Sequence, residues 1–126
     1  MIKKIFIIED FEKNIKLYKS IFKIIPNVEL IIESNGIKGL EILKSINPDL
    51  IILDNKLPGI NGIEICKELR KIEKFQKIPI IAVSSTPLDK DVERESFFID
   101  AGFDLLLSKP LKVNEFRKIV MNFLSK

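Results

Sequence analysis

The stretch that decides the fold is Pro48-Asp49-Leu50-Ile51-Ile52-Leu53-Asp54-Asn55-Lys56-Leu57-Pro58-Gly59. Its short apolar run lies between turn-forming residues, a pattern typical of a strand that is buried on both faces. The run ends in one carboxylate, Asp54, and a Pro-Gly turn follows shortly after it. Aspartate is a poor strand former. Asp54 is therefore either an ordinary turn or helix-start residue, or a reactive carboxylate at the mouth of an α/β sheet.

Segments with strand-like and helix-like patterns alternate along the chain. Apolar runs predict strands at residues 4–8, 28–32, 50–54, 79–83 and 105–107. Apolar residues three or four positions apart predict helices at about 11–25, 37–46, 63–72 and 112–124. A polar helix is expected at about 88–101, closed by Gly102. This alternation predicts an α/β protein with a parallel sheet covered by helices on both faces. The length of 126 residues favours a single domain over residues 1–126.

Each of these helices is expected to bury one apolar stripe. The inward-facing residues are expected to be Phe11, Ile15, Tyr18, Phe22 and Ile25 in the first helix; Ile37, Leu40, Leu43 and Ile46 in the second; Ile63, Cys66, Leu69 and Ile72 in the third; and Phe116, Ile119, Val120 and Phe123 in the last. Phe97 and Phe98 are adjacent in the fourth helix, so they cannot both face inward.

The composition limits the class of protein. Hydrophobic residues make up 46% of the chain and charged residues 31%, proportions typical of a soluble globular protein. No apolar run approaches the roughly 20 residues of a membrane span, and we expect no signal peptide. The net charge of +3 comes from mixed charges along the chain, unlike the clustered patch of a nucleic-acid-binding protein. The single cysteine, Cys66, is expected to be a packed free thiol in a cytoplasmic protein.

The chain contains no histidine. This absence excludes a Ser-His-Asp or Cys-His catalytic site, a histidine-ligated zinc ion and a histidine phosphodonor within the chain. Its chemistry must therefore use carboxylates, hydroxyls, lysine or a partner protein.

Polar residues follow four of the predicted strands. Glu9 and Asp10 follow the first strand, Asp54 ends the third, Ser84 follows the fourth and Lys109 comes two residues after the fifth. Right-handed crossovers place the carboxyl ends of all parallel strands at one edge of the sheet. Ligands of open α/β sheets bind at this edge. The sequence therefore predicts a functional site there.

Acidic, basic and hydroxyl groups at one edge suit phosphoryl chemistry. Clustered carboxylates repel one another unless a cation lies among them, and an all-oxygen site with water access favours Mg²⁺ over Ca²⁺. Lysine and serine can stabilise the charge that develops on a phosphoryl group. With no histidine or thiolate, the available nucleophile is a carboxylate, which can form an aspartyl phosphate.

The chain resembles the response-regulator receiver domains of two-component signalling over almost its whole length. The resemblance rests on four pieces in order: the pair Glu9-Asp10, Asp54 within residues 53–62, Ser84 within residues 80–85, and Lys109-Pro110 after residues 101–104. It implies a flavodoxin-like (βα)5 fold with a five-stranded parallel sheet of order 2-1-3-4-5. It also implies a cis Lys109–Pro110 bond, which is chemically reasonable in a tight turn.

The resemblance also implies roles for individual residues. Asp54 is the expected acceptor of a phosphoryl group from a phosphohistidine, with Lys109 paired to the phosphoryl oxygens and Ser84 hydrogen-bonded to one of them. Asp10, Asp54 and the backbone carbonyl of Lys56 are the expected Mg²⁺ ligands, and Glu9 is expected to act mostly through water. The expected activity is phosphotransfer to Asp54 with weak autodephosphorylation, in a signalling domain and not an enzyme.

Some positions depart from the family pattern. Glu9 stands where many members have a second aspartate, and Ser84 stands where many have threonine. Leu106 replaces an aromatic residue that moves inward on activation in the family, so the usual switch is in question. Lys56 and Thr86 lie where the family tunes autodephosphorylation, although an ordinary loop role fits them equally well.

The expected partners are a sensor histidine kinase or a histidine phosphotransfer protein and a downstream protein target, with no direct nucleic-acid or membrane binding. The chain could be a stand-alone regulator, a phosphorelay shuttle or a receiver cut from a hybrid kinase. A degenerate receiver that only binds proteins is the main alternative. A haloacid-dehalogenase-type phosphatase is disfavoured because Lys56 replaces its second aspartate. A flavodoxin-like electron carrier is disfavoured because Glu9 and Asp10 would repel a bound phosphate.

Overall fold

The computed structural model describes residues 1–85 and 92–125 and contains one five-stranded sheet. The strands are β1 (Lys3–Ile8), β2 (Val28–Glu33), β3 (Leu50–Asp54), β4 (Ile80–Ser84) and β5 (Leu105–Ser108). All neighbouring strands are parallel, in the order β2-β1-β3-β4-β5. The predicted α/β class, parallel sheet and strand order are therefore confirmed.

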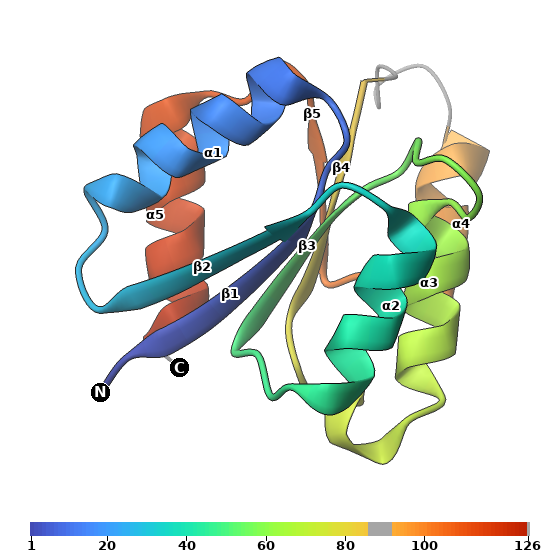
Figure 1. Ribbon diagram of the computed structural model, residues 1–126. Helices are drawn as coiled ribbons and strands as arrows, with labels where there is room; N and C mark the ends of the chain where they lie inside the picture. Colours follow the sequence, from blue (N-terminus) through green and yellow to red (C-terminus); the bar gives the residue numbers. More distant parts are fainter. Residues whose placement is uncertain (86–91, 126) are drawn as a thin grey trace.

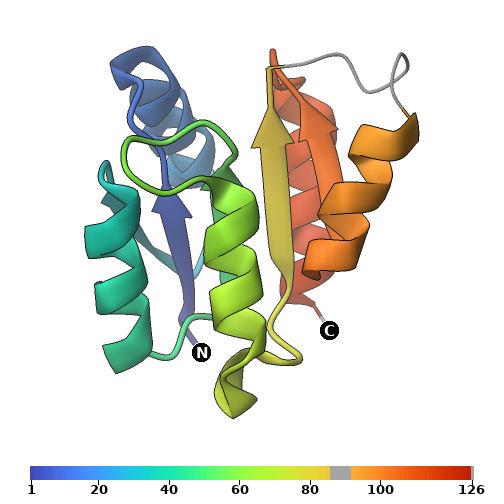
Figure 2. The same ribbon diagram turned by 90° about the vertical axis from the view of Figure 1, so that its right-hand side faces the viewer.

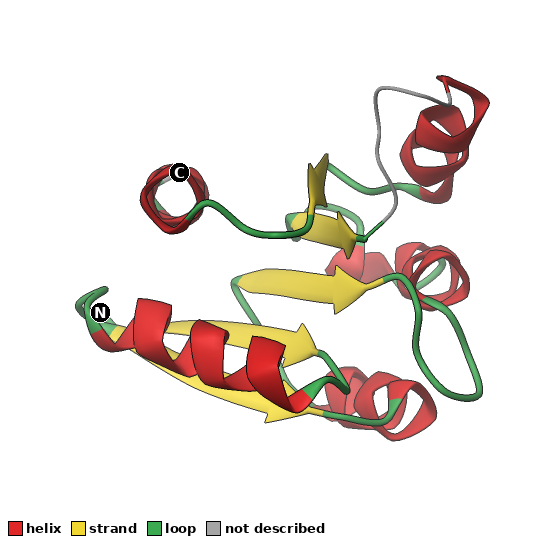
Figure 3. Cartoon of the chain, turned by 90° about the horizontal axis from the view of Figure 1, so that it is seen from above, coloured by secondary structure: helices red, strands yellow, loops and turns green. Residues whose placement is uncertain are grey.

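Helices cover both faces of the sheet. They are α1 (Glu12–Lys23), α2 (Gly36–Ser45), α3 (Gly62–Arg70), a short 3-10 helix η1 (Glu73–Phe75), α4 (Val92–Ala101) and α5 (Val113–Leu124). Helices α1 and α5 lie on one face, and α2, α3 and α4 lie on the other (Figures 1 and 3). Figure 2 shows the second group side by side in front of the strands. This arrangement is the predicted (βα)5 architecture.

Each face of the sheet has its own hydrophobic core. Tyr18 and Phe22 of α1 meet Phe116 of α5 over one face, with ring centroids 5.8 and 6.1 Å from Phe116. On the other face, α2, α3 and α4 pack against Ile51 and Leu53. Every residue of β3 is buried, as the apolar run at residues 50–53 predicted.

Two residues assigned to the inward stripes are exposed instead. Phe11 precedes α1 as its N-cap and is 55% exposed, because the helix begins one residue later. Ile37 is also 55% exposed, because α2 approaches β1 through Gly39 and lies against Ile60 and Ile65 through Gly36. A Cβ atom on Gly39 would lie 2.5 Å from Ile8 Cδ1, so a larger residue would require Ile8 or α2 to shift.

The remaining helix predictions agree in part with the structure. Phe98 is buried and Phe97 is exposed, as their adjacency required. The expected start of the fourth helix near residue 88, and Thr86, lie outside the described residues. None of the described helices has the length and hydropathy needed to cross a membrane.

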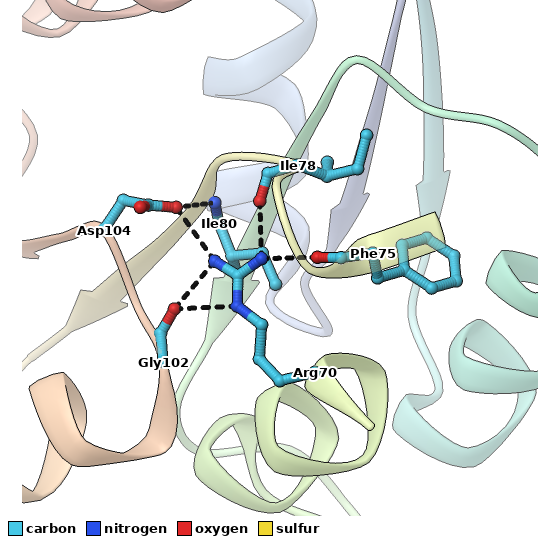
Figure 4. A network of polar contacts seen from close by, with 6 residues as sticks. All are labelled: Arg70, Phe75, Ile78, Ile80, Gly102 and Asp104. Atoms are coloured by element: carbon cyan, nitrogen blue, oxygen red, sulfur yellow. Dashed lines mark hydrogen bonds and ion pairs between the residues drawn. The ribbon is translucent and has the colours of Figure 1, made fainter. Parts of the chain in front are cut away.

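Arg70, in the last turn of α3, forms hydrogen bonds with several segments near the start of β4 and β5 (Figure 4). Its guanidinium donates five hydrogen bonds, to the carbonyl oxygens of Phe75, Ile78 and Gly102 and to the Asp104 carboxylate, with Gly102 accepting two. Asp104 also accepts a hydrogen bond from the backbone N–H of Ile80 at 2.8 Å. The C-terminal end of α3 is thereby joined to the start of β4 and to the turn before β5.

Candidate phosphoryl-transfer and metal site

Three carboxylates converge at the carboxyl edge of the sheet. Glu9 and Asp10 follow β1, and Asp54 is the last residue of the neighbouring strand β3. One carboxylate oxygen from each of the three lies within 4.8 Å of the others. Successive residues in extended chain point in opposite directions, and accordingly Glu9 is buried while Asp10 is exposed. The cluster therefore has one face in the protein and one face towards water.

Lys109 approaches this cluster from the turn after β5. Its backbone N–H donates to the carbonyl oxygen of Ser84 at 2.8 Å, and its peptide bond to Pro110 is cis, as the resemblance implied. The ammonium Nζ lies 3.2 Å from Glu9 Oε1 and 3.3 Å from Asp54 Oδ1. The lysine side chain is 18% exposed, so its charge lies partly buried between two carboxylates.

The remaining candidate residues lie around the same edge. Ser84 is the last residue of β4 and is buried, at 2% exposure. Lys56 is exposed in the loop after β3. Leu106, in the middle of β5, packs against the core that α2, α3 and α4 cover. An aliphatic side chain thus occupies the position where many family members carry an aromatic ring.

The electrostatics of the site centre on the buried carboxylate of Glu9. Burial raises the pKa of Glu9, and the negative charge of Asp54 raises it further, whereas the hydrogen bond from Phe11 N–H and the charge of Lys109 lower it. The Phe11 N–H donates to Glu9 Oε2 at 3.1 Å. The net upward shift means that the negative charge on Glu9 is incompletely compensated by its protein partners.

Sequence reasoning did not associate Tyr18 with this site. Tyr18 is buried on α1, and burial together with the charges of Glu9 and Asp54 raises its pKa, so the phenol stays protonated. It was predicted as a core residue, and its ring does pack on Phe116. The charges of Glu9 and Asp54 therefore act on its hydroxyl, an influence that no local sequence pattern indicates.

The donor set suits a hard divalent cation. Three carboxylate oxygens close together, one of them on an exposed residue, match the oxygen ligands and retained waters that Mg²⁺ prefers. The described residues offer no histidine or thiolate at this edge that would favour a softer metal. A carboxylate nucleophile beside a lysine ammonium is also the arrangement that an acyl-phosphate acceptor needs.

The fold and this edge define a receiver-type signalling domain. The family model for the response regulator receiver domain matches residues 5–121. The chain therefore belongs to this family of two-component signalling proteins. It is 32% identical over 124 residues to the polar-differentiation response regulator DivK of Brucella ovis, covering 98% of both chains, and equally similar to DivK of Brucella suis.

Solved structures share the fold across the whole chain. One neighbour is the receiver domain of the sensor histidine kinase PA1611 from Pseudomonas aeruginosa, which was solved with a magnesium ion coordinated in its active site cleft. It superposes with a TM-score of 0.86 at 23% identity, and the alignment covers 100% of both chains. The chemotaxis response regulator CheY4 of Vibrio cholerae gives a TM-score of 0.87 at 18% identity, covering 98% of this chain and 100% of its own. These neighbours establish the flavodoxin-like receiver fold.

Proposed function

We propose that the protein is a phosphoacceptor receiver in which Asp54 takes a phosphoryl group from a phosphohistidine on a partner. The observation that carries this proposal is the position of Asp54, with a carboxylate oxygen 3.3 Å from the Lys109 ammonium and within 4.8 Å of two further carboxylates. In the transfer, an Asp54 oxygen attacks phosphorus as the nitrogen–phosphorus bond of phosphohistidine breaks. The imidazole leaves with its electron pair and takes up a proton.

The residues around Asp54 have distinct tasks in this proposal. Before the transfer, the Lys109 ammonium is paired with the Asp54 carboxylate. After the transfer, it pairs with a phosphoryl oxygen and stabilises the negative charge of the phosphoryl group. Ser84 donates its hydroxyl hydrogen to another phosphoryl oxygen. Asp10, Asp54 and the Lys56 carbonyl would hold Mg²⁺, with Glu9 acting through water, and the ion would neutralise charge on the phosphoryl group.

The same proposal covers the setting of the reaction. The donor is a sensor histidine kinase or a histidine phosphotransfer protein in the cytoplasm, and a downstream protein recognises the phosphorylated state. The similarity to the response regulator DivK over 98% of both chains supports this setting. The half-buried Leu106 favours one alternative, a degenerate receiver that binds proteins without being phosphorylated.

Intact-mass measurement after incubation with acetyl phosphate separates these functions. The proposal predicts one phosphoryl adduct that requires Mg²⁺ and disappears in Asp54→Asn. Asp100→Asn is the matched control, because it removes an exposed carboxylate on α4, away from the site residues. Absence of an adduct on folded wild-type protein with Mg²⁺ would contradict the proposal and support the binding-only alternative.

A further inference from the structure

Helix α1 carries a one-sided basic surface. Lys13, Lys16, Lys19 and Lys23 are all exposed, and their spacing of three, three and four residues places them along one side of the helix. From Lys13 to Lys23 the rise of the helix is about 15 Å, at 1.5 Å per residue. We call these four residues the lysine stripe. The charges are mixed along the sequence as a whole, but these four lysines lie together on one face of α1.

The lysine stripe differs from the charged surfaces of α2, α3 and α5 by its single sign of charge. No ion pair joins any of its four lysines to a carboxylate in residues 1–85 and 92–125. Helices α2, α3 and α5 mix both signs of charge, whereas α1 has a single acidic residue, Glu12, in its first turn. Lys23, in the last turn of α1, is favoured there by the helix dipole. Lys13, Lys16 and Lys19 have no such role, and like charges three residues apart on one helix repel one another.

The lysine stripe begins beside the phosphoacceptor site. Helix α1 starts two residues after Asp10, and α1 leads away from the carboxyl end of β1 (Figure 1). Two exposed apolar side chains flank the stripe: Phe11 at the N-cap, 55% exposed, and Ile24 at the C-cap, 57% exposed. A protein that presents phosphohistidine to Asp54 must cover the exposed Asp10 and adjoining Phe11, and therefore reaches the first turns of α1.

We infer that the lysine stripe binds an acidic surface on the protein that donates the phosphoryl group to Asp54. This inference rests on the proposed function and adds the charge of the partner. Phe11 and Ile24 provide apolar contacts at the two ends, and the lysines between them contact carboxylates of the donor. Charged groups at the margin of an interface mainly accelerate encounter and select partners, so the interaction is expected to weaken with salt.

A protein partner fits this surface better than a nucleic acid or an anionic membrane. Asp10, Glu12 and Glu33 line one pocket with Lys19, a residue of the stripe. A phosphodiester backbone or a lipid surface presents negative charge uniformly and would be repelled by these carboxylates. A folded protein can place acidic residues opposite the lysines and neutral or basic residues opposite the carboxylates. The stripe also consists of lysine alone, without the arginines typical of phosphate recognition.

The test compares two variants with the same change in net charge. Lys16→Glu with Lys19→Glu reverses the centre of the stripe, and Lys67→Glu with Lys77→Glu reverses two exposed lysines outside α1. The probe is the purified phosphorylated histidine kinase or histidine phosphotransfer protein of the source organism that phosphorylates the wild-type chain fastest. Thermal unfolding establishes first that both variants fold.

We expect the stripe variant to lose at least tenfold in the phosphotransfer rate at low salt, and the control variant to lose less than threefold. Both should react with acetyl phosphate within twofold of wild type, because that small donor does not contact α1. The wild-type transfer rate should fall steeply with salt, and that of the stripe variant should not. Equal transfer rates for the two variants would overturn the inference, as would stripe-dependent binding to duplex DNA or to phosphatidylglycerol vesicles. Failure of wild type with acetyl phosphate would instead refute the proposed function.

Discussion

Replacing Arg70 with alanine should destabilise the protein strongly without changing the chemistry at Asp54. The change removes all five hydrogen bonds of the guanidinium and leaves three backbone carbonyls and the Asp104 carboxylate without this donor. Charge-assisted hydrogen bonds contribute roughly 1.5–3 kcal/mol each, although water can replace some of them because Arg70 is 18% exposed. We therefore expect the free energy of unfolding to fall by about 3–5 kcal/mol.

Urea unfolding followed by circular dichroism measures this loss, and two further variants define its cause. Arg70→Lys should recover less than half, because an ammonium cannot reach carbonyls on several sides as a planar guanidinium does. Lys71→Ala removes the neighbouring exposed pair with Glu68 and should cost less than about 0.5 kcal/mol. A loss below about 1 kcal/mol for Arg70→Ala, or full recovery by lysine, would refute the interpretation that this network holds α3, β4 and β5 together.

Three further predictions concern the metal, the helix packing and the cysteine. Mg²⁺ at about ten times its dissociation constant should raise the free energy of unfolding by about 1.4 kcal/mol. Thermal unfolding of wild type and Asp54→Asn, with and without Mg²⁺, measures this stabilisation, and an equal rise in the melting temperature of both proteins would contradict it. Gly39→Ala should lower the free energy of unfolding by about 1–3 kcal/mol, because the new Cβ would lie 2.5 Å from Ile8 Cδ1. Urea unfolding measures this loss, with Lys38→Ala at an exposed neighbouring position as the control. Equal stability of the two variants would contradict the close approach of α2 to Ile8. Burial raises the pKa of Cys66 from 9.0 to about 11, so the free energy of unfolding should fall as pH rises through this interval, since the unfolded thiol ionises first. Ellman's reagent at pH 8 should therefore label Cys66 at least tenfold more slowly in the native than in the urea-unfolded protein, and equal rates would show that the thiol is accessible.

Much of the fold follows from short-range patterns in the sequence. The apolar run before Asp54 and the runs that end at Ile8 and Val83 are too short for helices and too apolar for loops, so the strands could be placed. Parallel strands then place the residues after them at one edge, which is why the sequence predicts Glu9, Asp54 and Lys109 close together.

Other features depend on contacts that sequence patterns do not encode. Phe11 and Ile37 continue the apolar periodicity of their helices, but the start of α1 and the glycine contacts of α2 leave both exposed. Arg70 bonds mainly to backbone carbonyls, which every residue type carries, so no pairing of residue types along the sequence indicates its network. The lysine stripe could not be recognised from the net charge, because acidic residues elsewhere in the chain offset most of the positive charge.

The central claim is that Asp54 itself carries the phosphoryl group, and chemical trapping tests it most directly. An aspartyl phosphate is an acyl phosphate, which borohydride reduces to the alcohol, whereas a free carboxylate is unchanged. After treatment with acetyl phosphate and Mg²⁺, reduction and peptide mass spectrometry, we predict homoserine at position 54 and at no other acidic residue. Homoserine at Asp10 or Glu9, or an unreduced Asp54 in a protein that carries a phosphoryl adduct, would contradict the account.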